Sequence, residues 1–378
     1  MATSTTGTTF SALPTKHLFG ATTIRWSQVI ALTLLSAAIA ISWMAYHNFQ
    51  EPLLRQFGFE HLGSFVLTVQ AIILLVVPPW AGSIGDHYRA KGGSSLPVIM
   101  AGISIVAMIF MSVATTIAIS PEGFFRWLFP ILVVLWLIAM NIFHAPALAG
   151  LEDMVSAEKM PVAVGLLTLF TDLAYALEPV IVPVAQAIGA PITFAAGGIL
   201  IFISGIFYRS SIRSRHSDST IDNRLAPKVN RSAFTIVFFN GVLLGACMAF
   251  VQEVLPNLEF VRQMAFDGNT LAATILAVAA ILAFFAGMAV VRWGKQRAFI
   301  PVVSLALLLI ITFFMPLPTY LLVAALIAFV VAMAFASVTA LPASFARLRP
   351  EHKALGIGLF LAGTELIAGL IRLGILNF

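Results

Sequence analysis

The chain contains an internal repeat, in which residues 158–166 read EKMPVAVGL and residues 351–359 read EHKALGIGL. A Thr, an acidic residue and a Leu follow each segment at the same distance, at 171–173 and at 364–366. Every matched position is 193 residues from its counterpart. A second match sets Ala81-Gly82 against Ala286-Gly287, 205 residues later. Both matches join comparable loops to apolar segments, which predicts two similar halves in parallel orientation within one membrane fold.

The composition around the repeat predicts an all-α integral membrane protein. The 378 residues are 60% hydrophobic and 10% charged, and the mean hydropathy is +1.00. A soluble domain carries about a quarter of its residues as charged ones. Apolar runs of roughly 20 residues, the length of a membrane-spanning helix, lie between short charged clusters. About eleven spans are predicted, at 27–50, 62–84, 95–118, 126–149, 161–185, 190–208, 232–255, 268–291, 298–315, 318–342 and 355–376.

The basic residues predict the orientation of the chain. If the N-terminus is cytoplasmic, seventeen Lys and Arg residues fall in cytoplasmic segments and three outside. This bias follows the positive-inside rule, so we expect a multi-pass protein of the inner or plasma membrane with a cytoplasmic N-terminus. The predicted parts are a disordered tail at 1–26, a six-helix bundle at 27–208, a basic cytoplasmic linker at 209–231 and a five-helix bundle at 232–378.

A loop motif resembles the major facilitator superfamily. That family carries a Gly-x-x-x-Asp-Arg-x-Gly-Arg-Arg pattern between its second and third helices, and here the loop begins with Gly82 and Asp86 at the same spacing. His87 replaces the usual Arg, and later basic residues such as Arg89 are displaced. The resemblance implies a two-bundle, major-facilitator-like fold with alternating access. It also implies that Asp86 pairs with a cytoplasmic helix end and latches the outward-open state.

A narrower resemblance covers about 80 residues. Pro78-Pro79 before Gly82, and then Asn141, Pro146 and Asp153, are similar to the glycoside-cation symporter and sucrose-transporter branch. That branch makes a sugar the leading substrate. The superfamily normally has twelve spans, however, so a membrane-protein partner in place of a twelfth helix is also expected from the eleven predicted here.

Two acidic residues are the main candidates for a transport site. Asp172 and Glu365 lie near the middle of equivalent spans in the two halves, where secondary transporters bind substrates and coupling ions. Ionisable groups in hydrocarbon are costly and therefore functional candidates. Proton coupling is one interpretation, and a satisfied polar contact between helices is the other. Tyr175 shares a helix face with Asp172. Arg372, two turns after Glu365, either faces the interior or snorkels to the outer interface.

Two further clusters of polar residues lie within the spans. His47 and Asn48 follow Trp43 at the end of the first span, where they could contact a ligand or belong to an interfacial aromatic belt. Asn141 and His144 share a face of the fourth span, and His144 is either a proton relay or a hydrogen-bonded helix contact.

These patterns favour a secondary active transporter of a small polar solute, with proton coupling favoured over sodium. The alternative is a non-transporting assembly factor or a pigment or lipid carrier on the same fold, bound to a larger membrane complex. A polar, charged cavity would indicate the first and an apolar, aromatic cavity the second. The sequence holds no phosphate-binding loop, no Cys/His metal spacing and no nucleophile elbow, so we expect no enzyme activity, no metal, no cofactor and no nucleic-acid partner.

Overall fold

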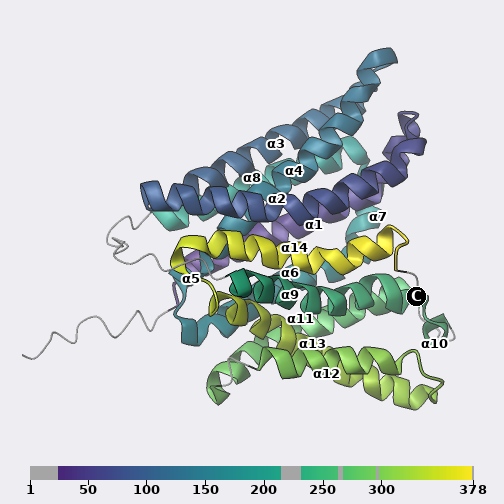
Figure 1. Cartoon of the computed structure of the whole chain (residues 1–378). Coiled ribbons are helices and arrows are strands. Elements are labelled where there is room, and N and C mark those ends of the chain that lie inside the picture. Colours follow the sequence, from purple (N-terminus) through teal and green to yellow (C-terminus); the bar gives the residue numbers. More distant parts are fainter. Residues whose placement is uncertain (1–23, 214–230, 263–266, 295–297, 377–378) are drawn as a thin grey trace, which may run out of the picture.

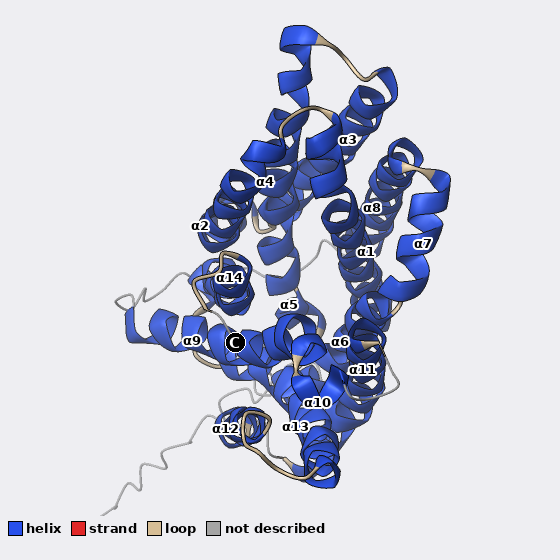
Figure 2. Ribbon diagram, turned by 90° about the vertical axis from the view of Figure 1, so that its right-hand side faces the viewer, coloured by secondary structure: helices blue, strands red, loops and turns tan. Residues whose placement is uncertain are grey.

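The computed structural model describes residues 24–213, 231–262, 267–294 and 298–376. All regular secondary structure in these ranges is helical (Figures 1 and 2). The predicted tail at 1–26 and linker at 209–231 lie mostly outside them, since α8 ends at Arg213 and α9 begins at Arg231. The helices are α1 Trp26–Gln56, α2 Gly63–Gly92, α3 Leu96–Ile119, α4 Leu128–Ala149, α5 Leu151–Met154, α6 Met160–Ala176, α7 Glu178–Ile188, α8 Ala190–Arg213, α9 Arg231–Ala249, α10 Glu259–Arg262, α11 Gly268–Trp293, α12 Phe299–Thr312, α13 Thr319–Phe345 and α14 Lys353–Arg372.

Each of the eleven predicted spans has a helical counterpart, which confirms the all-α membrane fold. Within the described ranges, ten helices are long and apolar enough to cross a membrane, and α7 and α12 are shorter apolar helices. Helix α12 accounts for the difference between ten long helices and eleven predicted spans. Helix α12 replaces the predicted span 298–315, and α7 is the second part of the predicted span 161–185.

The span predicted at 161–185 is broken, which corrects the sequence-based boundary. Helix α6 ends at Ala176, Leu177 adopts φ −82° and ψ 0°, and α7 starts at Glu178. Pro179 stands in the first turn of α7, and Pro183 lies inside it. A proline lacks the backbone N–H that would bond four residues back and clashes with that carbonyl, which favours a break here. The break turns α7 toward the end of the molecule that carries α10.

Helices α6 and α14 lie between the two bundles. Helix α14 packs against α2 and α9, and α6 packs against α11 and α1. Figure 1 shows both helices in the middle of the molecule, between α1–α4 on one side and α9–α13 on the other. These are the two helices that begin with the repeated sequence, so the repeat supplies the inner elements of the fold.

Glycines of the repeat form two equivalent helix crossings. A Cβ atom on Gly82 of α2 would overlap the backbone of α14, and one on Gly358 of α14 would overlap the backbone of α2. Gly165 of α6 and Gly287 of α11 make the same reciprocal contact with each other's helices. Small residues let helix backbones approach closely. The α2–α14 and α6–α11 contacts, which we call seams, are therefore equivalent, and each seam joins one helix from each half of the repeat.

Candidate functional site

A central cavity of about 840 Å³ lies between the two bundles. Its wall comes from α1, α2, α4, α6, α7, α9, α11, α13 and α14. At one end it reaches the exposed residues Glu178 of α7 and Asn269 of α11, and we call this the open end. At the other end α2, α5 and the start of α14 meet, and we call this the closed end. Figure 2 views the helices from the side that carries α7 and α10.

The cavity brings together most of the side chains predicted from the sequence. The predicted residues in its wall are His47, Asn141, His144, Asp172, Tyr175, Glu365 and Arg372. Gly82, Asp86 and Arg89 lie at the closed end instead. Asn48 does not line the cavity, contrary to the prediction. It lies one residue, and so about 100° around α1, from His47, and its amide oxygen accepts a hydrogen bond from Gln186 of α7 at 3.1 Å.

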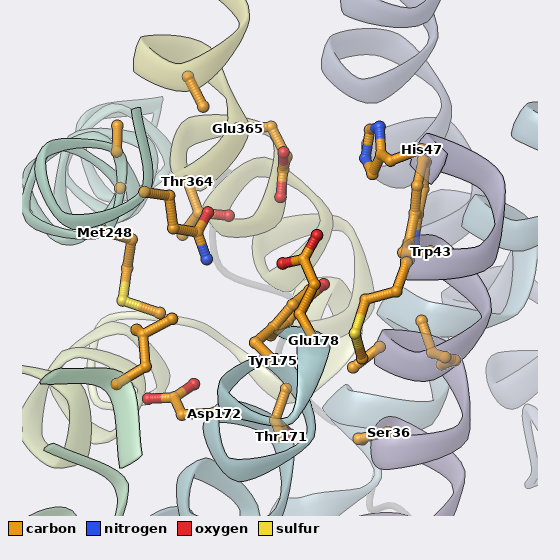
Figure 3. Close-up of a pocket in the computed structure, with 18 of the residues that line it drawn as sticks. Ser36, Trp43, His47, Thr171, Asp172, Tyr175, Glu178, Met248, Thr364 and Glu365 are labelled. Atoms are coloured by element: carbon orange, nitrogen blue, oxygen red, sulfur yellow. The ribbon is translucent and has the colours of Figure 1, made fainter. Parts of the chain in front are cut away.

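Asp172 is a nearly buried carboxyl group on the cavity wall. It is 4% exposed, and its side chain makes no hydrogen bond or ion pair with any residue that the structure describes. Tyr175 follows one turn later on α6, and Figure 3 shows both side chains projecting from that helix into the cavity. A buried polar group without a partner is unfavourable. An acid in this position is therefore available to a proton or a ligand.

A second charged group lies on the opposite bundle. Arg372 on α14 donates from Nε and Nη2 to Glu253 Oε1, at 2.8 and 2.6 Å. Glu365 lies two turns earlier on α14, lines the same cavity and is within electrostatic range of Arg372. Arg372 thus faces the interior, the first of its two predicted alternatives.

Glu253 is a cavity residue that the sequence analysis did not single out, and its position depends on an irregular turn. Helix α9 ends at Ala249 and continues as a π-helical turn at Phe250–Val254. Such turns are rare and frequently occur at functional sites. The only sequence signal was an acidic residue near the end of an apolar span.

An aromatic wall covers the α1 side of the cavity. The ring of His47 stacks on Trp43 at 5.5 Å, with an interplanar angle of 25°. Behind them Tyr46 stacks on Trp136 at 4.4 Å, and its hydroxyl donates to Gln70 at 3.4 Å. Trp43 lines the cavity and packs edge-on against Trp136, so it belongs to this wall and not to an interfacial belt.

Two polar residues of α4 face the cavity from the same bundle. The amide of Asn141 donates one N–H to the carbonyl oxygen of Leu137 at 2.8 Å, within the same helix. His144 is partly buried on the next turn and lines the cavity. These contacts leave the carboxyl groups as the main polar groups open to a ligand.

The closed end is held by polar contacts between and within the bundles. The Asp86 carboxylate accepts backbone N–H bonds from Ala354 at 3.0 Å and Leu355 at 2.9 Å, in the first turn of α14. A carboxylate at a helix N-terminus is favourable because it meets both free N–H groups and the helix dipole. Lys353 forms an ion pair with Glu152 of α5, also across the bundles.

Arg89 makes a different kind of contact from Asp86. It pairs with Asp153 of α5 at 2.6 Å, which joins two parts of the same bundle. Of the predicted loop residues, Gly82 and Asp86 therefore connect the two bundles, whereas Arg89 supports the helix that presents Glu152.

In the described part of the chain, no group of three or more His, Cys, Asp or Glu side chains is arranged to hold a metal ion. A two-bundle helical membrane fold with a charged central cavity is typical of secondary transporters. The family model described as Major Facilitator Superfamily matches residues 29–371. The chain belongs to the major facilitator superfamily.

Solved structures show the same fold. A bacterial homologue of the iron transporter ferroportin, in an outward-facing state with soaked iron, matches with a TM-score of 0.62 and 15% identity over 93% of this chain and 91% of that one. A double Trp mutant of XylE matches with a TM-score of 0.62 and 12% identity over 92% and 87%. At these identities the likeness concerns the fold alone. A search of curated proteins gives no match.

Membership of the major facilitator superfamily makes this chain a multi-pass membrane transporter of the secondary type and not an enzyme. None of these matches supports the narrower resemblance to the glycoside-cation symporter branch, which stays a prediction from the sequence.

Proposed function

We propose that this major facilitator moves a small polar solute by alternating access, with protons as the coupling ion. The observation that carries the proposal is Asp172, a carboxyl group without a partner among the described residues, in the wall of a cavity that lies between the bundles. A charge in such a place is costly. Taking up a proton or a solute would lower that cost, which is what a coupling site requires.

The two ends of the cavity fit an outward-open conformation. In this proposal the closed end faces the cytoplasm, in agreement with the distribution of basic residues, and Asp86 and Lys353 hold the two halves together there. The halves are residues 27–208 and 232–378, each moving as one body. Transport then requires the bonds from Asp86 to α14 to break while the open end closes.

Glu365 is the second proposed coupling residue. It occupies the position in α14 that Asp172 occupies in α6, because the two residues are 193 positions apart in the repeat. The arginine and the second acid beside it, Arg372 and Glu253, give it a more polar environment than Asp172 has. We therefore expect Asp172 to carry the larger share of the coupling.

The charged cavity argues against the carrier alternative. A pigment or lipid carrier needs an apolar cavity, because a buried carboxyl group beside a hydrocarbon ligand would lose its hydration without compensation. Five acidic residues line this cavity, namely Asp172, Glu178, Glu253, Asp267 and Glu365. A polar solute can compensate such groups, whereas a hydrocarbon cannot.

Proteoliposomes that hold the purified full chain would test the proposal. Uptake of a panel of neutral, cationic and anionic solutes would be measured with and without an imposed pH gradient, for the native chain and for Asp172→Asn and Glu365→Gln. Glu51→Gln is the matched control, since Glu51 is exposed and paired with Arg55 away from the cavity.

We expect uptake that responds to the pH gradient, that falls at least about tenfold in Asp172→Asn and that Glu51→Gln leaves unchanged. Uptake that keeps its pH dependence in both cavity variants would refute the coupling role of the acids. No uptake of any solute by folded, monodisperse protein would favour the carrier or assembly alternative.

A further inference from the structure

The charges of the cavity wall do not balance. Five acidic residues and one arginine line it. Arg372 is compensated by its ion pair with Glu253. Asp267 is occupied as the N-cap of α11, where it accepts the backbone N–H of Thr270 at 3.1 Å. Glu365 lies within electrostatic range of Arg372, but this arginine is already paired with Glu253. Among the described residues, Asp172, Glu178 and Glu365 have no ion pair or capping contact of their own, so the wall carries an excess of negative charge.

The excess charge is concentrated where a solute would lie. Asp172 is more than nine-tenths buried, without a partner among the described residues. Tyr175, one turn above it, is within electrostatic range of both Asp172 and Glu365. Figure 3 shows Tyr175 between these two carboxyl groups and Trp43 and His47 across the cavity from them. A ligand in this space meets carboxylates on one side and aromatic rings on the other.

Other classes of solute fit this wall poorly. An anion would meet uncompensated acids, and the single arginine is already neutralised. A sugar carries no charge and would leave the acids uncompensated, and the two amides deepest in the wall each have one group already bonded, Asn141 to Leu137 and Gln70 to Tyr46. A divalent metal ion prefers several oxygen or nitrogen ligands together, and the described residues contain no such group.

We infer that the cavity binds a small monovalent organic cation. Its charge lies at the Tyr175 ring, facing the Asp172 and Glu365 carboxyl groups on either side of that ring, and its apolar part packs on Trp43 across the cavity. Aromatic rings attract ammonium groups through their negative faces, most strongly when water is excluded. A soft, weakly hydrated cation also loses less hydration on entering than a metal ion does. This inference rests on the proposed transport function and names the substrate class for the same cavity.

A matched pair of ligands isolates the effect of the charge. Choline and 3,3-dimethylbutanol have nearly the same shape, but only choline carries a positive charge. Binding of both to the purified full chain would be measured by equilibrium dialysis, with benzoate, glucose and Mn²⁺ as anionic, sugar and metal probes. The variants are Asp172→Asn, the charge-retaining Asp172→Glu and the surface control Glu51→Gln, each checked for a monodisperse elution profile and native thermal stability.

We expect choline to bind at least about tenfold more tightly than its neutral isostere. Asp172→Asn should remove this preference, Asp172→Glu should retain part of it, and Glu51→Gln should leave it unchanged. Equal binding of the two isosteres, or tighter binding of benzoate, glucose or Mn²⁺ than of choline, overturns the inference. If Asp172→Asn does not fold, loss of the preference in Glu365→Gln decides the same question.

Counterflow uptake in proteoliposomes separates this inference from the transport proposal. Uptake of choline that depends on Asp172 supports both. Uptake of a neutral or anionic probe without choline uptake leaves the transport proposal standing and overturns the cation inference. Binding of choline that depends on Asp172, without uptake of any probe, supports the cation site and overturns transport.

Discussion

The contact between Asp86 and α14 predicts how strongly the closed end is held. The carboxylate accepts two backbone N–H bonds, at 3.0 and 2.9 Å, from the opposite bundle, and Asp86 is 8% exposed. Asp86→Asn keeps one of the two acceptor oxygens, replaces the other oxygen with an NH₂ group and removes the negative charge. Losing one charged hydrogen bond costs about 1.5–3 kcal/mol. The equilibrium ratio of molecules with the closed end shut to molecules with it open should therefore fall about 10- to 150-fold.

Distances between spin labels on the two bundles would measure this ratio. Lys91 of α2 and Arg292 of α11 are exposed and lie near the closed end of opposite bundles. Both would be labelled after substitution with cysteine in a Cys247→Ala background, which removes the sole native cysteine. We expect Asp86→Asn to add a longer distance to the distribution, because its closed end opens in a measurable fraction of molecules.

Asp153→Asn is the matched control at the same end. Asp153 pairs with Arg89 inside one bundle, and its side chain is 55% exposed. An exposed ion pair contributes about 0–1 kcal/mol, and this one does not join the bundles, so the ratio should change less than about threefold. An Asp86→Asn distribution that cannot be distinguished from that of Asp153→Asn would refute the reasoning.

Three further substitutions test a helix contact, an ion pair and a helix cap. Gly82→Ala should destabilise the α2–α14 contact by about 1–3 kcal/mol, because the added Cβ would overlap α14; the change would appear as a lower melting temperature or an opened closed end. Gly92→Ala is the control and should change neither, because no atom lies within 4 Å of its added Cβ. Arg372→Ala should destabilise the fold by about 1–3 kcal/mol, and adding Glu253→Gln should recover most of this loss; an additive double variant would contradict the ion pair. Asp267→Ala should cost about 1 kcal/mol in thermal unfolding, whereas Asp267→Asn should be tolerated as a cap.

The sequence predicted the architecture because membrane helices are long, apolar and separated by charged loops. The repeat also predicted which helices are equivalent, since the offsets of 193 and 205 residues identify the glycines at both seams. The break at Leu177 was readable in principle from Pro179 and Pro183. It was missed because the apolar run continues through both prolines.

The site was predictable only in part. Acids within apolar spans stand out, and Asp172 and Glu365 were found in this way. The pairing of Arg372 with Glu253 was not accessible, because it joins residues 119 positions apart and depends on a π-helical turn without a sequence signature. The orientation of Asn48 away from the cavity likewise depends on how α1 is rotated against α7.

The two seams are built from matching positions of the repeat but differ in chemistry. The offset of 205 places Val291 where Asp86 stands, and the offset of 193 places Pro161, which has no N–H, where Ala354 stands. Separating α2 from α14 exposes a carboxylate and two N–H groups that water can solvate, whereas the equivalent positions at the α6–α11 seam hold no carboxylate and one N–H fewer. We therefore expect the α2–α14 seam to separate when the closed end opens, while the α6–α11 seam stays in contact and acts as the hinge of the motion.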